Sequence, residues 1–440
     1  MAGNSRLGCS EAGAANKPRP KPIEEIPPIY ASDEIPRPQY RPLNAFAFDP
    51  AAGMIVGNSM TVMVRYEDLR PGPIGDRFAV IDYDGDCPNG MDFGVFYKLI
   101  DYSDVKLLIN GGMPLSQTDP RFHQQMVYAV ASETLQRFEA ALGRQIHWKL
   151  PDKAEHGASR REAGRRLNLF PHAMRQENAF YCREAQGILF GYFKANRINP
   201  GRNLPGQTVF TCLSHDIIAH EVTHAIVDGI RQYFIEATSH DTPAFHEAFA
   251  DIAALFSHFS HKDVLLDTLK KTGGQLYKLQ LKPDASDKMA GGEKNIQAQT
   301  AEDNPLIALA TQFGQARGMG TALRRALGSV PNPNDIKTKL EPHERGSILV
   351  AAVFDAYFTI YLRRTADLFA IWRSGGVTSD CDIPAELAER LAAEASRTAD
   401  DFFVICARAL DYCPPVDVTF GDFLRAILTA DLDLHPDDPE

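Results

Sequence analysis

The chain has few cysteines and no long hydrophobic run. Its seven cysteines are widely spaced, odd in number and without a Cys-Xaa-Xaa-Cys pair. This spacing favours free thiols in a reducing compartment over a disulfide framework. No apolar run reaches the roughly eighteen residues that a membrane helix requires, and residues 1–9 lack the apolar core of a signal peptide. The sequence therefore predicts a cytoplasmic protein without a membrane span.

Basic residues are also in the minority. Lys and Arg total 46 against 57 Asp and Glu, which gives a net charge of −11. A nucleic-acid-binding surface usually needs the opposite balance, so no nucleic-acid partner is expected. The sequence contains no internal repeat, and it leaves the oligomeric state open.

The most informative motif is His-Glu-Val-Thr-His at residues 220–224. Positions i and i+4 lie on one face of a helix, so His220 and His224 can hold one metal ion between them. Glu221 lies close enough to act as general base on a metal-bound water. This pattern is typical of zinc hydrolases. Taken alone, it also fits an amphipathic helix whose two histidines face water.

A catalytic zinc needs a third protein ligand as well as an open position for water. The third histidine of metzincins is absent, since Ile230 and Val227 stand at the positions of that motif's histidine and glycine. A second helix is predicted to begin near Pro243 and to direct Glu247 toward the first helix. Asp251, one turn later, could accept the second ring N–H of a ligating histidine. The two helices together predict a zinc site with Glu247 as third ligand.

Four stretches resemble the thermolysin-like metallopeptidases of the gluzincin clan. Residues 216–225 are similar to that family's active-site helix, and Glu247-Ala248 with Asp251 is similar to its third-ligand segment. Residues 178–181, Asn-Ala-Phe-Tyr, resemble its edge strand, and residues 342–348 resemble the segment with a histidine that contacts the transition state. A weaker likeness starts at residues 119–123. The resemblance covers about residues 116–360.

This resemblance implies a zinc-dependent endopeptidase that acts on a peptide or protein substrate. His343 would stabilise the oxyanion, and Asn178 and Ala179 would hold an extended peptide along the edge strand. Arg345 could hold a substrate carbonyl by a forked contact, or it could form a salt bridge within the protein. An ordinary surface histidine and an ordinary edge strand are the alternatives for His343 and for residues 178–181.

The chain departs from the family at several positions. His246 stands where the family usually has asparagine, and Ile235 stands where it often has tyrosine, with Tyr233 nearby. Ser257, His258 and His261 stand in the region of the family's acidic calcium cluster. Asp216 alone cannot supply the roughly six to eight oxygens that calcium requires, so no family-type calcium site is expected.

These observations predict an α+β fold of the zincin type, with two domains and an active-site cleft between them. The expected parts are a proline-rich arm (1–42), a β-rich region (43–115), a catalytic domain (116–262) and a mainly helical domain (263–440). Helices are predicted near 120–142, 214–231, 304–317, 345–375, 384–410 and 418–431. Strands are predicted near 60–66, 77–83, 145–150, 177–183, 186–193 and 207–213.

Two other functions stay open. An aminopeptidase on the same scaffold would contain a Gly-Xaa-Met-Glu-Asn segment, which this sequence lacks. The second is a catalytically weak zincin-fold protein that serves as a binding or regulatory module. Glu221 argues against it, because a structural metal site needs no general base. The stretch of only about 115 residues before the catalytic region, too short for the family's pro-segment, keeps it open.

Overall fold

The computed structural model describes most of the chain between residues 38 and 437. The described residues are 38–47, 50, 58–85, 95–149, 165–200, 203–263, 265–266, 334–374 and 384–437. The chain divides into two compact units, Met1–Pro38 and Gln39–Glu440, and all the elements below belong to the second. The helix predicted at 304–317 and nearly all of the proline-rich arm lie outside the described residues. The boundaries expected at residues 115 and 262 stay predictions.

A mixed five-stranded sheet lies in the second unit. Its strand order is β3 (Phe78–Val80), β6 (Leu167–Met174), β8 (Gly187–Lys194) and β7 (Ala179–Cys182), and β9 (Thr208–Phe210) also pairs with β8. Strands β3, β6 and β8 run parallel, whereas β7 and β9 run antiparallel to β8. Within the described part of the chain, β7 is therefore an edge strand of this sheet.

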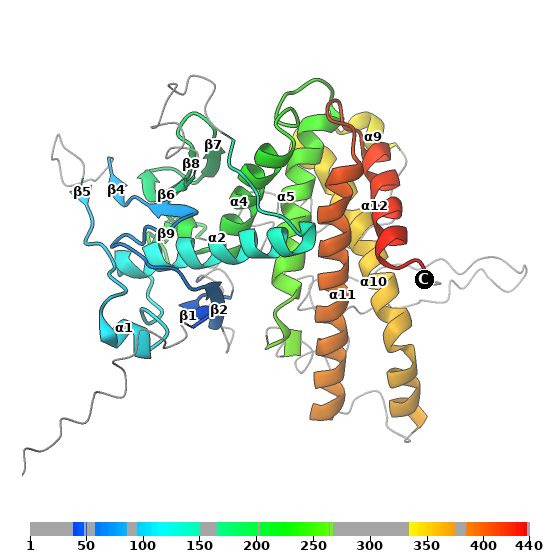
Figure 1. Cartoon of the computed structure of the whole chain (residues 1–440), viewed down its shortest axis with the longest axis horizontal. Coiled ribbons are helices and arrows are strands. Elements are labelled where there is room, and N and C mark those ends of the chain that lie inside the picture. Colours follow the sequence, from blue (N-terminus) through cyan, green and yellow to red (C-terminus); the bar gives the residue numbers. More distant parts are fainter. Residues whose placement is uncertain are drawn as a thin grey trace, which may run out of the picture. The chain divides into compact units, whose positions relative to one another are not determined.

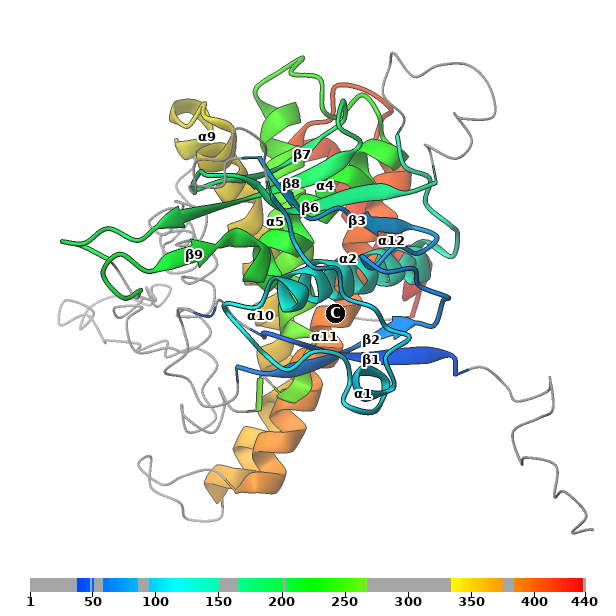
Figure 2. The ribbon, with the colours of Figure 1, turned by 90° about the vertical axis from the view of Figure 1, so that its left-hand side faces the viewer.

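Two helices, α2 (Pro120–Leu142) and α4 (His215–Ile230), pack against each other and against the sheet (Figures 1 and 2). Asp119 begins α2, because its side chain accepts a hydrogen bond from Arg121 N at 3.0 Å. Gly143, with a φ of 66°, ends the helix in the left-handed conformation that suits glycine. The observed bounds of α2 confirm the predicted ones.

Short elements surround α2. Strands β1 (Tyr40–Ala45) and β2 (Met60–Arg65) form an antiparallel pair that contacts it, and β4 (Tyr83–Asp84) pairs with β5 (Val95–Phe96). Helix α1 (Val105–Ile109) precedes α2, and a 3₁₀ turn, Thr211–Leu213, precedes α4. Strand β1 begins at Tyr40, inside the segment predicted as an extended arm.

The later part of the chain is helical. Helix α5 (Asp241–Phe259) lies against α4, and α9 (Asp335–Thr338), α10 (Pro342–Ser374), α11 (Ala385–Tyr412) and α12 (Phe420–Leu434) follow. Helix α5 packs against both α10 and α11 (Figure 1). Buried aromatic rings fill this contact: the ring centroid of Phe256 lies 5.4 Å from that of Tyr357 and 5.7 Å from that of Phe402. Helix α5 is thus the central element between α4 and the later helices.

The eight α-helices and nine strands among the described residues make the fold α+β. The strand predicted near 145–150 is wrong, since residues 145–149 form no ladder. Trp148 is nevertheless buried beside Phe78, and its indole N–H donates to the carbonyl of Arg77 at 3.1 Å. The apolar alternation of this segment therefore reflects packing without strand pairing.

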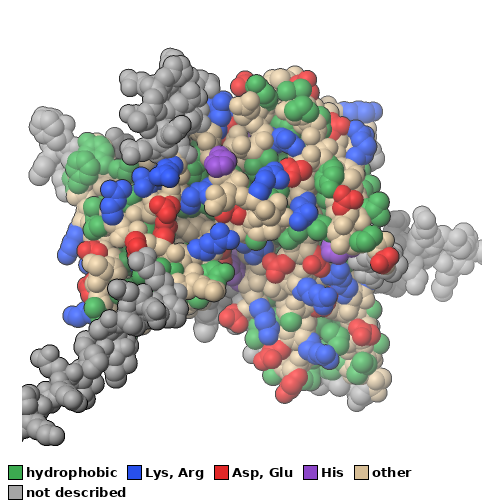
Figure 3. Space-filling view, viewed as in Figure 1, with side chains coloured by type: hydrophobic (Ala, Val, Ile, Leu, Met, Phe, Trp, Pro, Cys, Tyr) green, Lys and Arg blue, Asp and Glu red, His purple; other side chains and the backbone are tan. Residues whose placement is uncertain are grey.

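Helix α10 has an unusually apolar sequence. By length and composition alone, the stretch Pro342–Trp372, whose most apolar 18-residue window has a mean hydropathy of 1.3, could cross a membrane. Half of its most apolar window is buried within the protein, and the core helix of a soluble protein can have the same composition. On the face shown in Figure 3, acidic and basic side chains are interspersed.

Candidate metal centre

Helix α4 places two imidazoles side by side. His220 and His224 are four residues apart on one helical face, and both are buried. Their ring centroids lie 4.5 Å apart at an interplanar angle of 84°. The motif at residues 220–224 therefore forms the face of a helix that packs inside the protein, not a face turned to water.

Helix α5 brings a carboxylate to these imidazoles. Glu247 Oε2 lies 3.3 Å from His220 Nε2 and 3.5 Å from His224 Nε2. Burial by itself would raise the pKa of the Glu247 carboxyl, but His224 and His220 outweigh burial and hold that pKa well below its ordinary value. The one oxygen and two nitrogens lie within 4.8 Å of one another, so they can share a single ion.

The donor set fits a zinc ion. Two imidazole nitrogens and one carboxylate oxygen are a combination found in catalytic zinc sites. Asp251 Oδ1 lies 2.7 Å from His220 Nδ1, the position from which a carboxylate commonly orients a ligating histidine. The apolar side chains of α5 around these carboxylates are buried, among them Phe245 and Phe249.

His246, a residue with no predicted role, contacts the second histidine of the motif. Its Nδ1 lies 2.6 Å from His224 Nδ1, and the two rings stack at an angle of 15°. Burial, with the adjacent charge of His224, lowers the pKa of His246 to about 3. If His224 Nδ1 donates, the neutral His246 ring keeps its proton on Nε2. That nitrogen is buried and has no hydrogen-bond partner among the described residues.

The carboxylate of Glu221 contacts strand β7. The backbone N–H of Tyr181 donates to Glu221 Oε2 at 3.1 Å. Two turns of helix later along α4, Asp228 accepts hydrogen bonds from Tyr181 Oη at 2.7 Å and from Arg183 Nε at 2.9 Å. These contacts fix the edge strand against the helix that carries His220 and His224.

A cavity of about 290 Å³ opens over this centre. Its lining comes from β7 and the residue before it, from α4, α5 and α10, and from the loop between α4 and α5: Asn178, Ala179, Phe180, Tyr181, Glu221, His224, Ile235, His246, Glu247 and His343. Because the Tyr181 N–H points away from β8 toward Glu221, the alternation of an antiparallel ladder turns the Ala179 carbonyl the same way. Asn178 Oδ1 accepts from Ala179 N at 2.9 Å.

His343 enters the cavity from the first turn of α10. Its Nε2 lies 3.4 Å from Glu247 Oε2, and its Nδ1 lies 2.8 Å from Glu341 Oε1. The side chain is 41% exposed, so it is accessible from solvent as well as from the centre. The structure thus brings together residues about 165 positions apart, from Asn178 to His343, around one cavity.

Of the two contacts predicted as alternatives for Arg345, the structure shows the salt bridge within the protein. It is buried, and its Nε donates to Asp241 Oδ1 at 2.7 Å while Nη1 donates to the carbonyl of Lys339 at 3.1 Å. Arg345 is not among the residues that line the cavity. The expected forked contact with substrate is corrected accordingly, because its donors are directed at the protein itself. Tyr233 is 51% exposed and is also absent from the lining.

A second set of histidines lies at the opposite end of the two metal-site helices. Asp216 Oδ1 lies 3.0 Å from His258 Nδ1 and 3.7 Å from His215 Nδ1. On the other side of the same ring, His215 Nε2 lies 3.6 Å from Glu133 Oε2 of α2. Imidazoles thus stand in the region where the resembled family has its acidic calcium cluster.

Comparison with known proteins adds no assignment: no family model matches the chain, and no curated protein matches its sequence.

Proposed function

We propose that this protein is a zinc-dependent metallopeptidase of the two-domain zincin type that hydrolyses internal peptide bonds. The observation that supports this best is the convergence of His220, His224 and Glu247 with Glu221 at one cavity. The two histidines and Glu247 would hold the ion. Bound zinc would supply a Lewis acid for the substrate carbonyl and would lower the pKa of a water molecule.

Glu221 is the proposed general base. Its carboxylate would take the proton from the attacking water and deliver it to the departing amine as the peptide bond breaks. The hydrogen bond from Tyr181 N to Glu221 Oε2 supports this role, because it holds the carboxylate at the cavity wall. A metal site that served only for structure would have no use for such a carboxylate.

Two imidazoles would stabilise negative charge on the substrate oxygen. Glu341 accepts a hydrogen bond from His343 Nδ1, so a protonated His343 ring would present Nε2–H to the cavity. His246 would present its own Nε2–H if His224 donates at Nδ1. Both donors would act on the charge that develops as the carbonyl carbon becomes tetrahedral.

The edge strand favours an extended peptide as the substrate. Strand β7 lines the cavity, and an edge strand can pair with one further strand through its outward backbone groups. The Ala179 carbonyl would accept from a substrate N–H, and the Asn178 side chain would bind next to it. Phe180, which is 38% exposed, would offer an apolar contact to a substrate side chain.

Cleavage of a mixed peptide library by the wild type and by Glu221→Gln, with zinc stoichiometry measured on both, tests this proposal. We expect one catalytic zinc in each protein, and loss of cleavage by at least about a hundredfold in the variant, because a glutamine cannot take the proton. Glu236→Gln is a matched control, since Glu236 is exposed in the loop after α4. The control should cleave like the wild type.

A specific result would favour the alternative of a catalytically weak zincin-fold binding module. If the wild type holds zinc at this centre but cleaves nothing in the library, the peptidase proposal fails and the binding module stands. If Glu221→Gln cleaves as fast as the wild type, the assigned base is wrong.

A further inference from the structure

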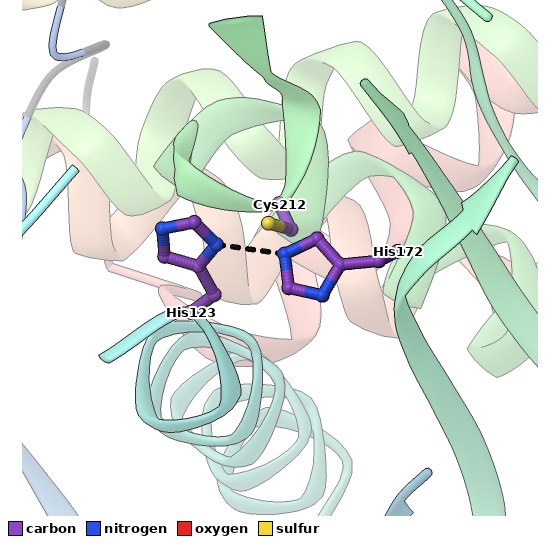
Figure 4. Close-up of side chains that lie close together, drawn as sticks. All are labelled: His123, His172 and Cys212. Carbon is purple, nitrogen blue, oxygen red and sulfur yellow. Dashed lines mark hydrogen bonds between the residues drawn. The ribbon is translucent and has the colours of Figure 1, made fainter. Parts of the chain in front are cut away.

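Three donor side chains meet at a second place, away from the cavity. His123 comes from α2, His172 from β6, and Cys212 from the 3₁₀ turn before α4. His123 Nδ1 lies 2.8 Å from His172 Nε2, and the Cys212 sulfur and both nitrogens lie within 4.8 Å of one another. Figure 4 shows the two rings facing each other with the sulfur beside them. His123, His172 and Cys212 are at most 1% exposed.

The outer nitrogens of both rings face groups that can only accept hydrogen bonds. His172 Nδ1 lies 2.6 Å from Asp82 Oδ1, and this carboxylate also accepts from Gln124 Nε2 at 2.7 Å. His123 Nε2 lies 3.2 Å from the carbonyl oxygen of Gln117. A neutral imidazole has one ring hydrogen, so each ring places its hydrogen on the outer nitrogen.

The inner nitrogens are then left with two lone pairs that face each other across 2.8 Å. Two lone pairs at that distance repel, and both imidazoles are buried beside the ring of Phe210, whose centroid lies 4.6 Å from that of His123 and 5.4 Å from that of His172. A positive charge between the nitrogens removes the repulsion. That charge can be a proton or a metal ion, and only the metal ion makes use of the neighbouring sulfur.

We propose that His123, His172 and Cys212 form a second metal site, for Zn²⁺ or a softer transition-metal ion such as Cu⁺. Two imidazole nitrogens and a thiolate are borderline-to-soft donors, which such ions prefer and which Ca²⁺ and Mg²⁺ do not. Asp82 orients His172 in the way that a carboxylate commonly orients a ligating histidine. The Cys212 thiolate and the Asp82 carboxylate together balance the charge of a divalent ion.

The site would have a structural effect. It joins α2, β6 and the turn that begins α4, three segments whose ligands are separated by 49 and 40 residues in the chain. Because α4 carries His220 and His224, an ion at this second site would fix the start of the metal-site helix relative to the sheet. The proposal of a second metal site is independent of the peptidase proposal, which uses none of these three ligands.

Cobalt can test this site separately from the first, because only the second site has a sulfur ligand. The full-length reduced protein, stripped of metal with a chelator, is titrated with Co²⁺. A cysteine thiolate bound to Co²⁺ gives a near-ultraviolet charge-transfer absorption, whereas the centre at His220 gives only weak visible bands. We expect two equivalents of Co²⁺ to bind and one of them to produce the charge-transfer absorption.

Cys212→Ser should abolish the charge-transfer absorption and leave one equivalent bound. Cys406→Ser is a matched control, since Cys406 is also buried but lies in α11, and it should keep the absorption. Cys182→Ser, at a partly buried thiol on β7, is a second control. If Cys212→Ser does not fold, the titration of the wild type still tests the second site. Binding of only one equivalent of Co²⁺, without the charge-transfer absorption, would mean that a proton lies between the two imidazole nitrogens and that the proposal is wrong.

Persistence of the absorption in a folded Cys212→Ser protein would also overturn it. A protein that shows the sulfur absorption but cleaves no peptide would refute the peptidase proposal alone. Conversely, an active peptidase with a single metal and no absorption would refute only the second site.

Discussion

His220 and His224 present the same ring atom to the metal centre, but different groups hold their other ring nitrogens. A carboxylate, Asp251, lies at His220 Nδ1, whereas an imidazole, His246, lies at His224 Nδ1. The negative charge of Asp251 raises the basicity of the His220 ring more than a neutral acceptor would. The two ligands are therefore not equivalent, and His220 should be the stronger of the pair.

Replacing Asp251 with asparagine removes this charge with little change in shape. We expect the zinc affinity of Asp251→Asn to fall about 10- to 100-fold, measured by competition with a chromophoric chelator. Asp355→Asn, at an exposed position of α10, is the control and should bind zinc like the wild type. An Asp251→Asn protein that holds zinc as tightly as the wild type would show that the 2.7 Å contact does not tune the ligand.

Residue spacing in the sequence predicted most of the side chains that meet at the candidate metal centre, but not every contact between them. The i, i+4 interval placed His220 and His224 on one face, and the same logic placed Asp251 one turn after Glu247. The stacking of His246 on His224 joins two different helices, and no spacing within either helix encodes it. The one sign in the sequence that pointed to this contact was His246 itself, which stands where the resembled family usually has asparagine.

At the scale of elements, the crossing of α5 and α10 positions His343. Gly346 lies at this crossing, one turn after His343, and a Cβ atom there would lie 2.8 Å from the Ala244 carbonyl oxygen and 3.4 Å from Ala248 Cβ. Both atoms belong to α5: Ala244 lies three residues before Glu247, and Ala248 lies one residue after it. The absence of a side chain at Gly346 therefore lets the first turn of α10 approach Glu247.

Gly346→Ala should separate the two helices. Overpacking of this kind costs about 1–3 kcal/mol, and the resulting shift of His343 should lower kcat roughly ten- to a hundredfold with zinc retained. Denaturant unfolding and peptide cleavage measure the two effects. Gly421→Ala in α12 is the control, because the nearest atom to its added Cβ is 3.7 Å away. The free energy of unfolding of the control should rise by up to about 1 kcal/mol, and its kcat should stay the same. If Gly346→Ala and Gly421→Ala have the same stability and the same kcat, the close approach of α10 to α5 at Gly346 does not position His343.

The elements were predictable where the local pattern was strong. Asp119, Pro120 and Gly143 mark the ends of α2 in the sequence itself. Strand β6 was missed, and it contains Pro171, a residue that normally argues against a strand. Strand β1, with Pro42, was assigned to the proline-rich arm for the same reason. In both strands, pairing with a neighbour outweighs the local preference.

At the scale of the whole molecule, a buried charge network connects three helices. His215 at the start of α4 lies between Glu133 of α2 and Asp216, and His258 and His261 lie around the same ring from α5 and the turn after it. Burial opposes a charge on His215, but Asp216 and Glu133 outweigh it and raise its pKa to about 9. Burial lowers the pKa of His261 to about 4, so this neighbour stays neutral at pH 7. The network could not be predicted, because its members lie far apart in the chain.

This network predicts a pH dependence of stability. The pKa of His215 is higher in the folded protein, about 9, than its ordinary value of 6.5, so its stabilising charge is fully present below pH 6.5 and is lost as the pH rises through 9. Over that range the free energy of unfolding of the wild type should fall by about 2–3 kcal/mol relative to His215→Gln. Denaturant unfolding of both proteins at several pH values measures this difference, in which metal binding common to both cancels. His147→Gln, at an exposed position after α2, should follow the wild type. Parallel curves for the wild type and His215→Gln between pH 6.5 and 9 would mean that His215 is not charged between its two carboxylates.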